Sequence, residues 1–245
     1  MRGKLAHWAE DAARRAAAVL SRPFHTQQRE LSEHMRRLFT AHRVDCAFDV
    51  GAHRGKYRRF LRYEVGFGGL VVSVEPIAEL AAALEMRARH TPLWQVHHCA
   101  LGAAPGKAVL NVMASSDFSS FLAPEHSATA QYAARNVVER KVEVEVRTLE
   151  QLAAGLAQQP RSIFLKLDTQ GYDLEVLRGA GRSLESVVAL QSEVPFQPIY
   201  AGMPDWRKSI TRITELGFSL AGLYAVSRDA SLRLIEADCV FVRSR

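Results

Sequence analysis

The stretch Val44-Asp-Cys-Ala-Phe-Asp-Val-Gly-Ala-His-Arg-Gly55 joins an apolar run to a glycine-rich turn, and it decides the fold. Residues 44–50 are typical of a buried strand. Gly51 and Gly55 let the backbone approach a ligand closely, and the N-terminus of a helix beginning near Tyr57 would favour negative charge. The stretch therefore predicts the first strand–turn–helix unit of an α/β domain.

Strands and helices alternate along the rest of the chain. Further strands are predicted over residues 70–74, 94–101, 163–167, 187–194, 218–226 and 234–242, and alternating segments over 106–112 and 142–146. Helices are predicted over residues 77–90, 149–156, 174–184 and 206–216. This alternation predicts a mostly parallel sheet with helices on both faces. The connection between the last two strands is too short for a crossover helix, so these strands must be antiparallel.

The positive net charge is confined to one end of the chain. The 245 residues carry a formal charge of +6, which at face value suggests nucleic acid or an anionic membrane as partner. Residues 1–43 hold 9 Lys and Arg against 4 Asp and Glu, whereas residues 44–245 hold 23 against 22. The body is nearly neutral, so we expect no nucleic-acid partner.

Residues 1–43 predict a helical extension ahead of a domain over residues 44–245. Apolar residues recur at helical spacing over residues 4–20, and a second helix places Leu31, Met35, Leu38 and Phe39 on one face. Both stripes can simply pack on the body. Alternatively, the extension caps the substrate mouth or contacts anionic lipid through its Arg-rich face.

The composition indicates a reduced, cytoplasmic setting. Cys46, Cys99 and Cys239 each lie in an apolar run without the spacing of a disulfide framework or a zinc site, so buried free thiols are expected. No apolar run is long enough to span a membrane, and charges interrupt the N-terminus where a secretory signal would be apolar. The oligomeric state stays open.

An acidic residue follows the second predicted strand, twenty residues after Gly55. Glu75 can accept hydrogen bonds from both hydroxyls of a ribose, and Pro76 suits the first turn of the next helix. A dinucleotide site needs a different glycine spacing, and Asp49 beside the turn would repel a pyrophosphate. The same acid favours the cationic cofactor S-adenosylmethionine, so the sequence predicts that cofactor over NAD.

Five short motifs occur in order at the predicted strand ends. They are Asp49–Gly55, Ser73–Pro76, Cys99–Gly102, Lys166–Gly171 with Leu174–Ala180, and Ala237–Phe241. Together they resemble the FkbM family of S-adenosylmethionine-dependent methyltransferases over residues 44–243. The resemblance implies the Rossmann-like class I methyltransferase fold, whose seven-stranded, mostly parallel sheet has an antiparallel terminal strand.

The resemblance also implies an activity and a cofactor site. The activity is methyl transfer, typically to a hydroxyl oxygen. The turn containing Asp49, Gly51, His53 and Gly55 would hold the methionine part of the cofactor. The remaining cofactor contacts would come from Glu75 and Pro76 at the ribose and from Ala100 and Leu101 beside adenine. Asn is frequent in the family at position 53, and an acid is frequent where this chain has Gln170.

Two carboxylates are predicted at adjacent strand ends, where ligands of α/β sheets bind. Asp168 or Glu193 could remove the proton of an acceptor hydroxyl, or both could hold a Mg²⁺ ion that lowers its pKa. Alternatively, Asp168 positions the ammonium group of the cofactor or caps the next helix, and Glu193 pairs with a base. Lys166 lies on the same buried strand, so a nearby carboxylate such as Asp49 is expected to pair with it.

Two loops are candidate parts of the acceptor site. The Ser-rich stretch 115–121 could fold over the site or be a plain surface connection, and His126 beyond it could act as a base near neutral pH. Residues 200–206 are a candidate wall of the acceptor pocket. We therefore expect an O-methyltransferase acting on a glycan, a lipid, a polyketide or another secondary metabolite. A non-catalytic cofactor-binding scaffold and an NAD-type oxidoreductase are the alternatives.

Overall fold

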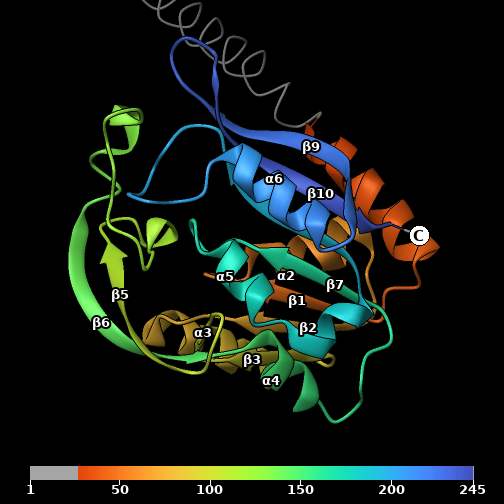
Figure 1. Cartoon of the computed structure of the whole chain (residues 1–245). Coiled ribbons are helices and arrows are strands. Elements are labelled where there is room, and N and C mark those ends of the chain that lie inside the picture. Colours follow the sequence, from red (N-terminus) through yellow and green to blue (C-terminus); the bar gives the residue numbers. More distant parts are fainter. Residues whose placement is uncertain (1–26, 245) are drawn as a thin grey trace, which may run out of the picture.

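The computed structural model describes residues 27–244, which form ten strands and a set of mostly short helices (Figure 1). The predicted helix over residues 4–20 lies outside the described residues. The strands are β1 Cys46–Val50, β2 Leu70–Val74, β3 Trp94–His97, β4 Ala100–Leu101, β5 Gly106–Met113, β6 Val138–Arg147, β7 Ile163–Leu167, β8 Val187–Pro195, β9 Phe218–Arg228 and β10 Leu234–Arg243. The helices are α2 Lys56–Phe60, α3 Ala78–Ala88, α4 Leu149–Ala154, α5 Asp173–Arg178 and α6 Trp206–Glu215, preceded by a helical stretch over residues 27–41.

Seven strands form the main sheet in the order β3-β2-β1-β7-β8-β10-β9. The pairs from β3 to β8 are parallel, and β10 is antiparallel to both β8 and β9. The predicted seven-stranded, mostly parallel sheet and the antiparallel final pair are therefore confirmed. The antiparallel strand is the last in sequence but not the outermost in space, because β9 forms the edge of the sheet.

Side chains alternate between the two faces of the main sheet, as expected for strands buried on both sides. Phe48 and Leu165 point to the face covered by α4, α5 and α6. Ala47 and Phe164, their chain neighbours, point to the face covered by residues 27–41, α2 and α3. The result is a three-layer sandwich with a separate core on each side.

The helical stretch 27–41 is part of that second core. Leu31, Met35, Leu38 and Phe39 are all buried, and the Phe39 ring lies 4.9 Å from the ring of Phe164 on the central strand β7. The predicted apolar stripe of this helix thus packs on the body. No helix within residues 27–244 is long and apolar enough to cross a membrane.

A second, three-stranded sheet lies beside the main one, in the order β4-β6-β5 (Figure 1, left). The prediction of a single strand over residues 94–101 is wrong, because the strand is interrupted at His98 and Cys99. Its first part, β3, belongs to the main sheet, and its second part, β4, belongs to the second sheet. The helix predicted over residues 174–184 also ends early. A Cβ on Gly179 would lie 2.0 Å from the Gly102 carbonyl oxygen, so the chain turns there and continues as a 3-10 helix over Gly181–Ser186.

The three cysteines agree with the sequence interpretation. Cys46, Cys99 and Cys239 are buried and free, and burial raises the pKa of each thiol. They are packing residues of the main core.

We predict that Met35→Ala destabilises the protein by about 2–5 kcal/mol, because the fully buried thioether would leave a cavity beneath the sheet. Chemical denaturation measures this change. Arg37→Ala on the exposed side of the same helix is the control and should change stability by no more than about 0.5 kcal/mol. An equal, small effect of both substitutions would contradict the packing described here.

Candidate functional site

A cavity of about 720 Å³ opens at the carboxyl ends of the parallel strands of the main sheet. The glycine turn after β1, the end of β2, β4 of the second sheet and the ends of β7 and β8 all contribute to its wall. Most of the predicted site residues line it, namely Gly51, His53, Glu75, Pro76, Ala100, Leu101, Asp168 and Glu193. The predicted residues Asp49, Gly55 and His126 are outside this lining.

The turn after β1 is held tightly between the two neighbouring strands. The N–H groups of Gly51 and Ala52 both donate to the Val74 carbonyl at 3.0 Å, and the Asp168 N–H donates to the Val50 carbonyl at 3.1 Å. Gly51 has a φ of +80°, and a Cβ there would lie 2.0 Å from the Asp168 carbonyl oxygen. Only glycine fits this position, so the turn fixes where Asp168 leaves β7.

Gly55 and Asp49 flank the turn but do not line the cavity. Gly55 (φ +71°) faces α3, where a Cβ would lie 3.0 Å from the Leu84 side chain. Asp49 is fully buried in β1, and neither of its carboxylate oxygens has a hydrogen-bond partner among residues 27–244. Burial and the nearby Asp168 carboxylate raise the pKa of Asp49 to about 6, against the lowering effect of Lys166.

Lys166 pairs with a different carboxylate from the one expected. Its Nζ lies 2.7 Å from Oδ2 of Asp168, the residue that follows β7, whereas Asp49 is only its register neighbour on β1. Burial opposes the charge of Lys166, but Asp168 and Asp49 together hold its pKa above the usual value. The expected structural pair exists, with Asp168 in the place proposed for Asp49.

Glu75 is oriented by two backbone groups at the end of β2. Its Oε2 accepts the His53 N–H at 2.7 Å and its Oε1 accepts the Ile77 N–H at 2.9 Å. The side chain is 4% exposed, and burial raises its pKa to about 7 although both N–H groups favour the charged form. Each oxygen keeps a lone pair for a further donor in the cavity.

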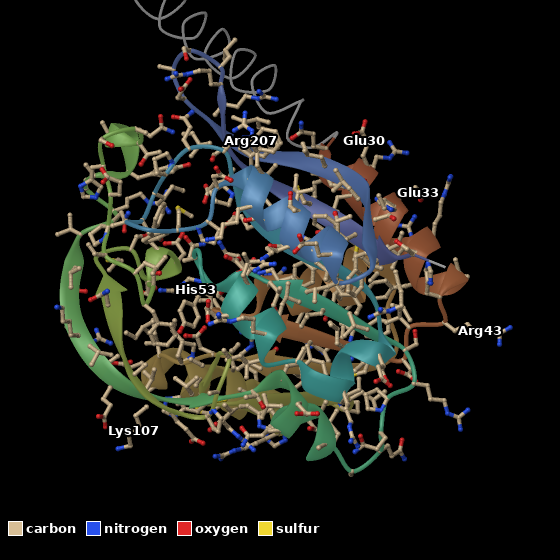
Figure 2. The ribbon with its side chains drawn as sticks, viewed as in Figure 1. Glu30, Glu33, Arg43, His53, Lys107 and Arg207 are labelled. Carbon is tan, nitrogen blue, oxygen red and sulfur yellow. The ribbon has the colours of Figure 1, made fainter. Side chains whose placement is uncertain are left out.

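The Ser-rich stretch closes one side of the cavity. Ser116, Asp117, Ser119 and Phe121 contribute to its lining. Ser116 Oγ lies 2.8 Å from Nε2 of His53, a half-buried side chain that is labelled in Figure 2. These contacts attach the stretch to the site, so it is more than a plain surface connection.

Asp168 and Glu193 meet at the side chain of Gln170. The Nε2 of Gln170 donates to Oδ1 of Asp168 at 2.8 Å and to Oε2 of Glu193 at 2.9 Å. The two predicted carboxylates are thus brought together. Although burial opposes its charge, Lys166 holds the pKa of Asp168 below the usual value, whereas burial and the carboxylates of Glu236, Asp168 and Asp238 raise the pKa of Glu193 well above it.

The sequence interpretation missed several polar residues of this region. Gln191 and Asp238 line the cavity, and Tyr57 donates to Oε1 of Gln191 at 2.6 Å. Asp238 lies directly opposite Glu193 in the β8–β10 register. Asp238 and Gln170 both belong to quoted motifs, so their place in those motifs was the available signal. Nothing in the sequence pointed to Gln191.

His126 is not brought to the cavity. Its Nε2 lies 2.8 Å from the Asn136 carbonyl oxygen, in the connection between the two strands β5 and β6. The candidate acceptor wall 200–206 is also outside the cavity lining. Tyr200 is buried behind Gln170, and Trp206 begins α6 with its ring stacked on Phe196 at 5.5 Å.

The donor set does not fit the Mg²⁺ ion considered from the sequence. The amide nitrogen of Gln170 occupies the position between Asp168 and Glu193 that a shared cation would need. Across residues 27–244, no three His, Cys, Asp or Glu side chains are arranged to hold a metal.

The fold and the site together define a class of protein. A sheet in this strand order, with one antiparallel inner strand, a glycine turn after the first strand and an acid after the second, is that of an α/β methyltransferase. The sequence profile of the methyltransferase FkbM domain matches residues 49–220, and the chain belongs to this family.

A solved structure of an FkbM methyltransferase agrees on the fold. The FkbM methyltransferase of Methylobacillus flagellatus KT superposes with a TM-score of 0.52 at 18% identity, over 81% of this chain and 43% of that one. The chain thus spans less than half the length of that relative. Magnesium protoporphyrin IX methyltransferase from Synechocystis PCC 6803 with bound SAM has a TM-score of 0.46 and 9% sequence identity. The match covers 91% of this chain and 83% of that one. No curated protein matches the sequence.

We predict that Gly51→Ala destabilises the protein more than Gly66→Ala does. Both positions have a φ near +80°, so alanine costs about 1–2 kcal/mol at either one. Only at Gly51 does the new methyl group meet a backbone carbonyl, which adds about 1–3 kcal/mol, whereas Gly66 has nothing within 4 Å. Equal denaturation midpoints for the two variants would contradict the close approach of the turn to β7.

Proposed function

We propose that this chain is an S-adenosylmethionine-dependent O-methyltransferase acting on a hydroxyl of a glycan, a lipid or a secondary metabolite. The observation that carries the proposal is Glu75. Its carboxylate is oriented at the cavity by the N–H groups of His53 and Ile77, which leaves lone pairs for the two hydroxyls of a ribose.

The charge of the cavity supports this cofactor over a dinucleotide. Glu75, Asp168, Glu193 and Asp238 all line the cavity, and the ammonium of Lys166 is already paired with Asp168. Carboxylates at short range repel a pyrophosphate and attract a sulfonium or an ammonium group. Burial raises the pKa of three carboxylates of this set, Glu75, Glu193 and Asp238, and a bound cation would favour their ionised forms.

The same residues can accept the proton that O-methylation releases. When bound, S-adenosylmethionine supplies an electrophilic methyl group. Transfer of that methyl group to a hydroxyl oxygen would release the hydroxyl proton, and a carboxylate of this cavity would accept it. Glu193 suits this role better than Asp168, because its raised pKa makes it the stronger base, whereas Asp168 is stabilised as an anion by Lys166.

We predict that Glu75→Gln weakens binding of S-adenosylhomocysteine by about 10- to 100-fold, the loss expected for a charged hydrogen bond to a ribose hydroxyl. Isothermal titration calorimetry measures this. Glu79→Gln, on the exposed face of α3, is the matched control and should bind as the wild type does. Tight binding of NAD by the wild type, with no binding of S-adenosylhomocysteine, would overturn the proposed cofactor.

We further predict that methyl transfer becomes faster as the pH rises through the pKa of Glu193, because only its ionised form accepts a proton. The measurement is transfer of a labelled methyl group into a cell extract, followed by identification of the labelled product. Glu193→Gln should slow transfer by about 10²–10⁴-fold, and the exposed Glu185→Gln should not. A rate independent of pH throughout the acidic range would instead indicate Asp168, whose pKa is lowered.

A further inference from the structure

Gln170 lies just after β7, where two contacts and an uncommon backbone conformation place it. Its backbone has a φ of +52°, in the left-handed region that side-chain-bearing residues rarely adopt, and its carbonyl accepts the hydroxyl of Ser120 at 2.7 Å. The side-chain oxygen lies 2.8 Å from the hydroxyl of Tyr200. Contacts from the Ser-rich stretch and from the segment after β8 hold this uncommon backbone conformation. They fix the direction in which the Gln170 side chain points.

The side chain of Gln170 places its amide nitrogen within hydrogen-bond distance of the carboxylates of Asp168 and Glu193. The Nε2 of Gln170 has two hydrogens, and the oxygens of Asp168 and Glu193 accept one each. If the amide were rotated by 180°, its oxygen would face both carboxylates and lose both hydrogen bonds. The hydroxyl of Tyr200 lies 2.8 Å from the amide oxygen and 2.7 Å from the Phe118 carbonyl oxygen, and its single hydrogen can be donated to only one of them. The two carboxylates therefore set the orientation of the amide.

We propose that Gln170 is a positioning residue of this site, whose amide nitrogen holds the carboxylates of Asp168 and Glu193 side by side. The proposal rests on the proposed function, since that function gives the carboxylate pair its role as proton acceptor. An amide in this place donates to both anions without adding a charge. A carboxylate here would instead add a third negative charge to the pair.

The surroundings of Glu193 explain why such a donor matters. The side chains facing it come from β7 and the residue after it, from β10, from the segment after β8 and from the 3-10 turn Ala130–Tyr132. They are Lys166 and Asp168, Glu236 and Asp238, Tyr200 and Tyr132. Three of these groups are carboxylates, and the ammonium of Lys166 is paired with Asp168. The N–H from Gln170 is the hydrogen bond that Glu193 receives within residues 27–244, and it favours the ionised form.

The test is a titration of the Glu193 carboxyl group by carbon-13 NMR, with the resonance assigned from Glu193→Gln. We expect Gln170→Met, which keeps the length of the side chain and removes the donor, to raise the pKa of Glu193 by about one unit. Gln170→Glu should raise it further. Gln95→Glu adds the same charge at an exposed position of β3 and should leave the pKa unchanged.

Gln170→Asn keeps the test decisive if Gln170→Met or Gln170→Glu fails to fold, since it keeps a polar amide of smaller volume. Its amide is one methylene shorter and cannot reach both carboxylates, so it should also raise the pKa of Glu193. An unchanged pKa in the folded variants overturns the proposal. The titration uses the protein without cofactor or acceptor, so failure of the proposed function appears separately, as absent binding of S-adenosylhomocysteine by the wild type.

Discussion

The ion pair between Lys166 and Asp168 is the interaction on which the rest of the site depends. An ammonium buried in the central strand of a sheet would be strongly destabilising without a partner. Asp168 supplies that partner at 2.7 Å and is itself fixed by the approach of Gly51 to its carbonyl group. Since Gln170 and Glu193 are arranged around Asp168, the position of this carboxylate determines the geometry of the whole carboxylate group.

Much of the architecture follows from patterns that a single sequence contains. The alternation of apolar strands and helices predicts the parallel sheet, and the short connection between β9 and β10 predicts their antiparallel pairing. The break of residues 94–101 into two strands was not predictable in this way. Both halves are apolar and extended, and only the second sheet, formed by pairing with the distant strand β6, decides where the chain leaves the first.

The sequence predicts which strand ends form the candidate site, but it does not predict the hydrogen bonds and ion pairs between their side chains. Strand ends place Glu75, Asp168 and Glu193 at one edge, because parallel strands finish on the same side of a sheet. The partner of Lys166 was assigned to Asp49 because register alone favours a neighbour on β1. The ion pair of Lys166 with Asp168 depends on the direction of the two side chains. The hydrogen bonds of Gln170 to Asp168 and Glu193 depend on side-chain direction in the same way. The prediction of His126 at the site is wrong, because its side chain contacts Asn136 away from the cavity. A polar loop residue has no periodicity in the sequence that would locate it.

The inner position of β10 has a consequence for the order in which the chain folds. β10 lies between β8 and β9 in the sheet and follows both in the sequence, so it can take its place only after both neighbours have been made. Until it inserts, β8 is an open edge of the main sheet and β9 has no strand partner there, so both are exposed to incorrect pairing or aggregation. Glu236 and Asp238 lie on β10, so a nascent chain lacks these two carboxylates beside Glu193 until β10 has inserted.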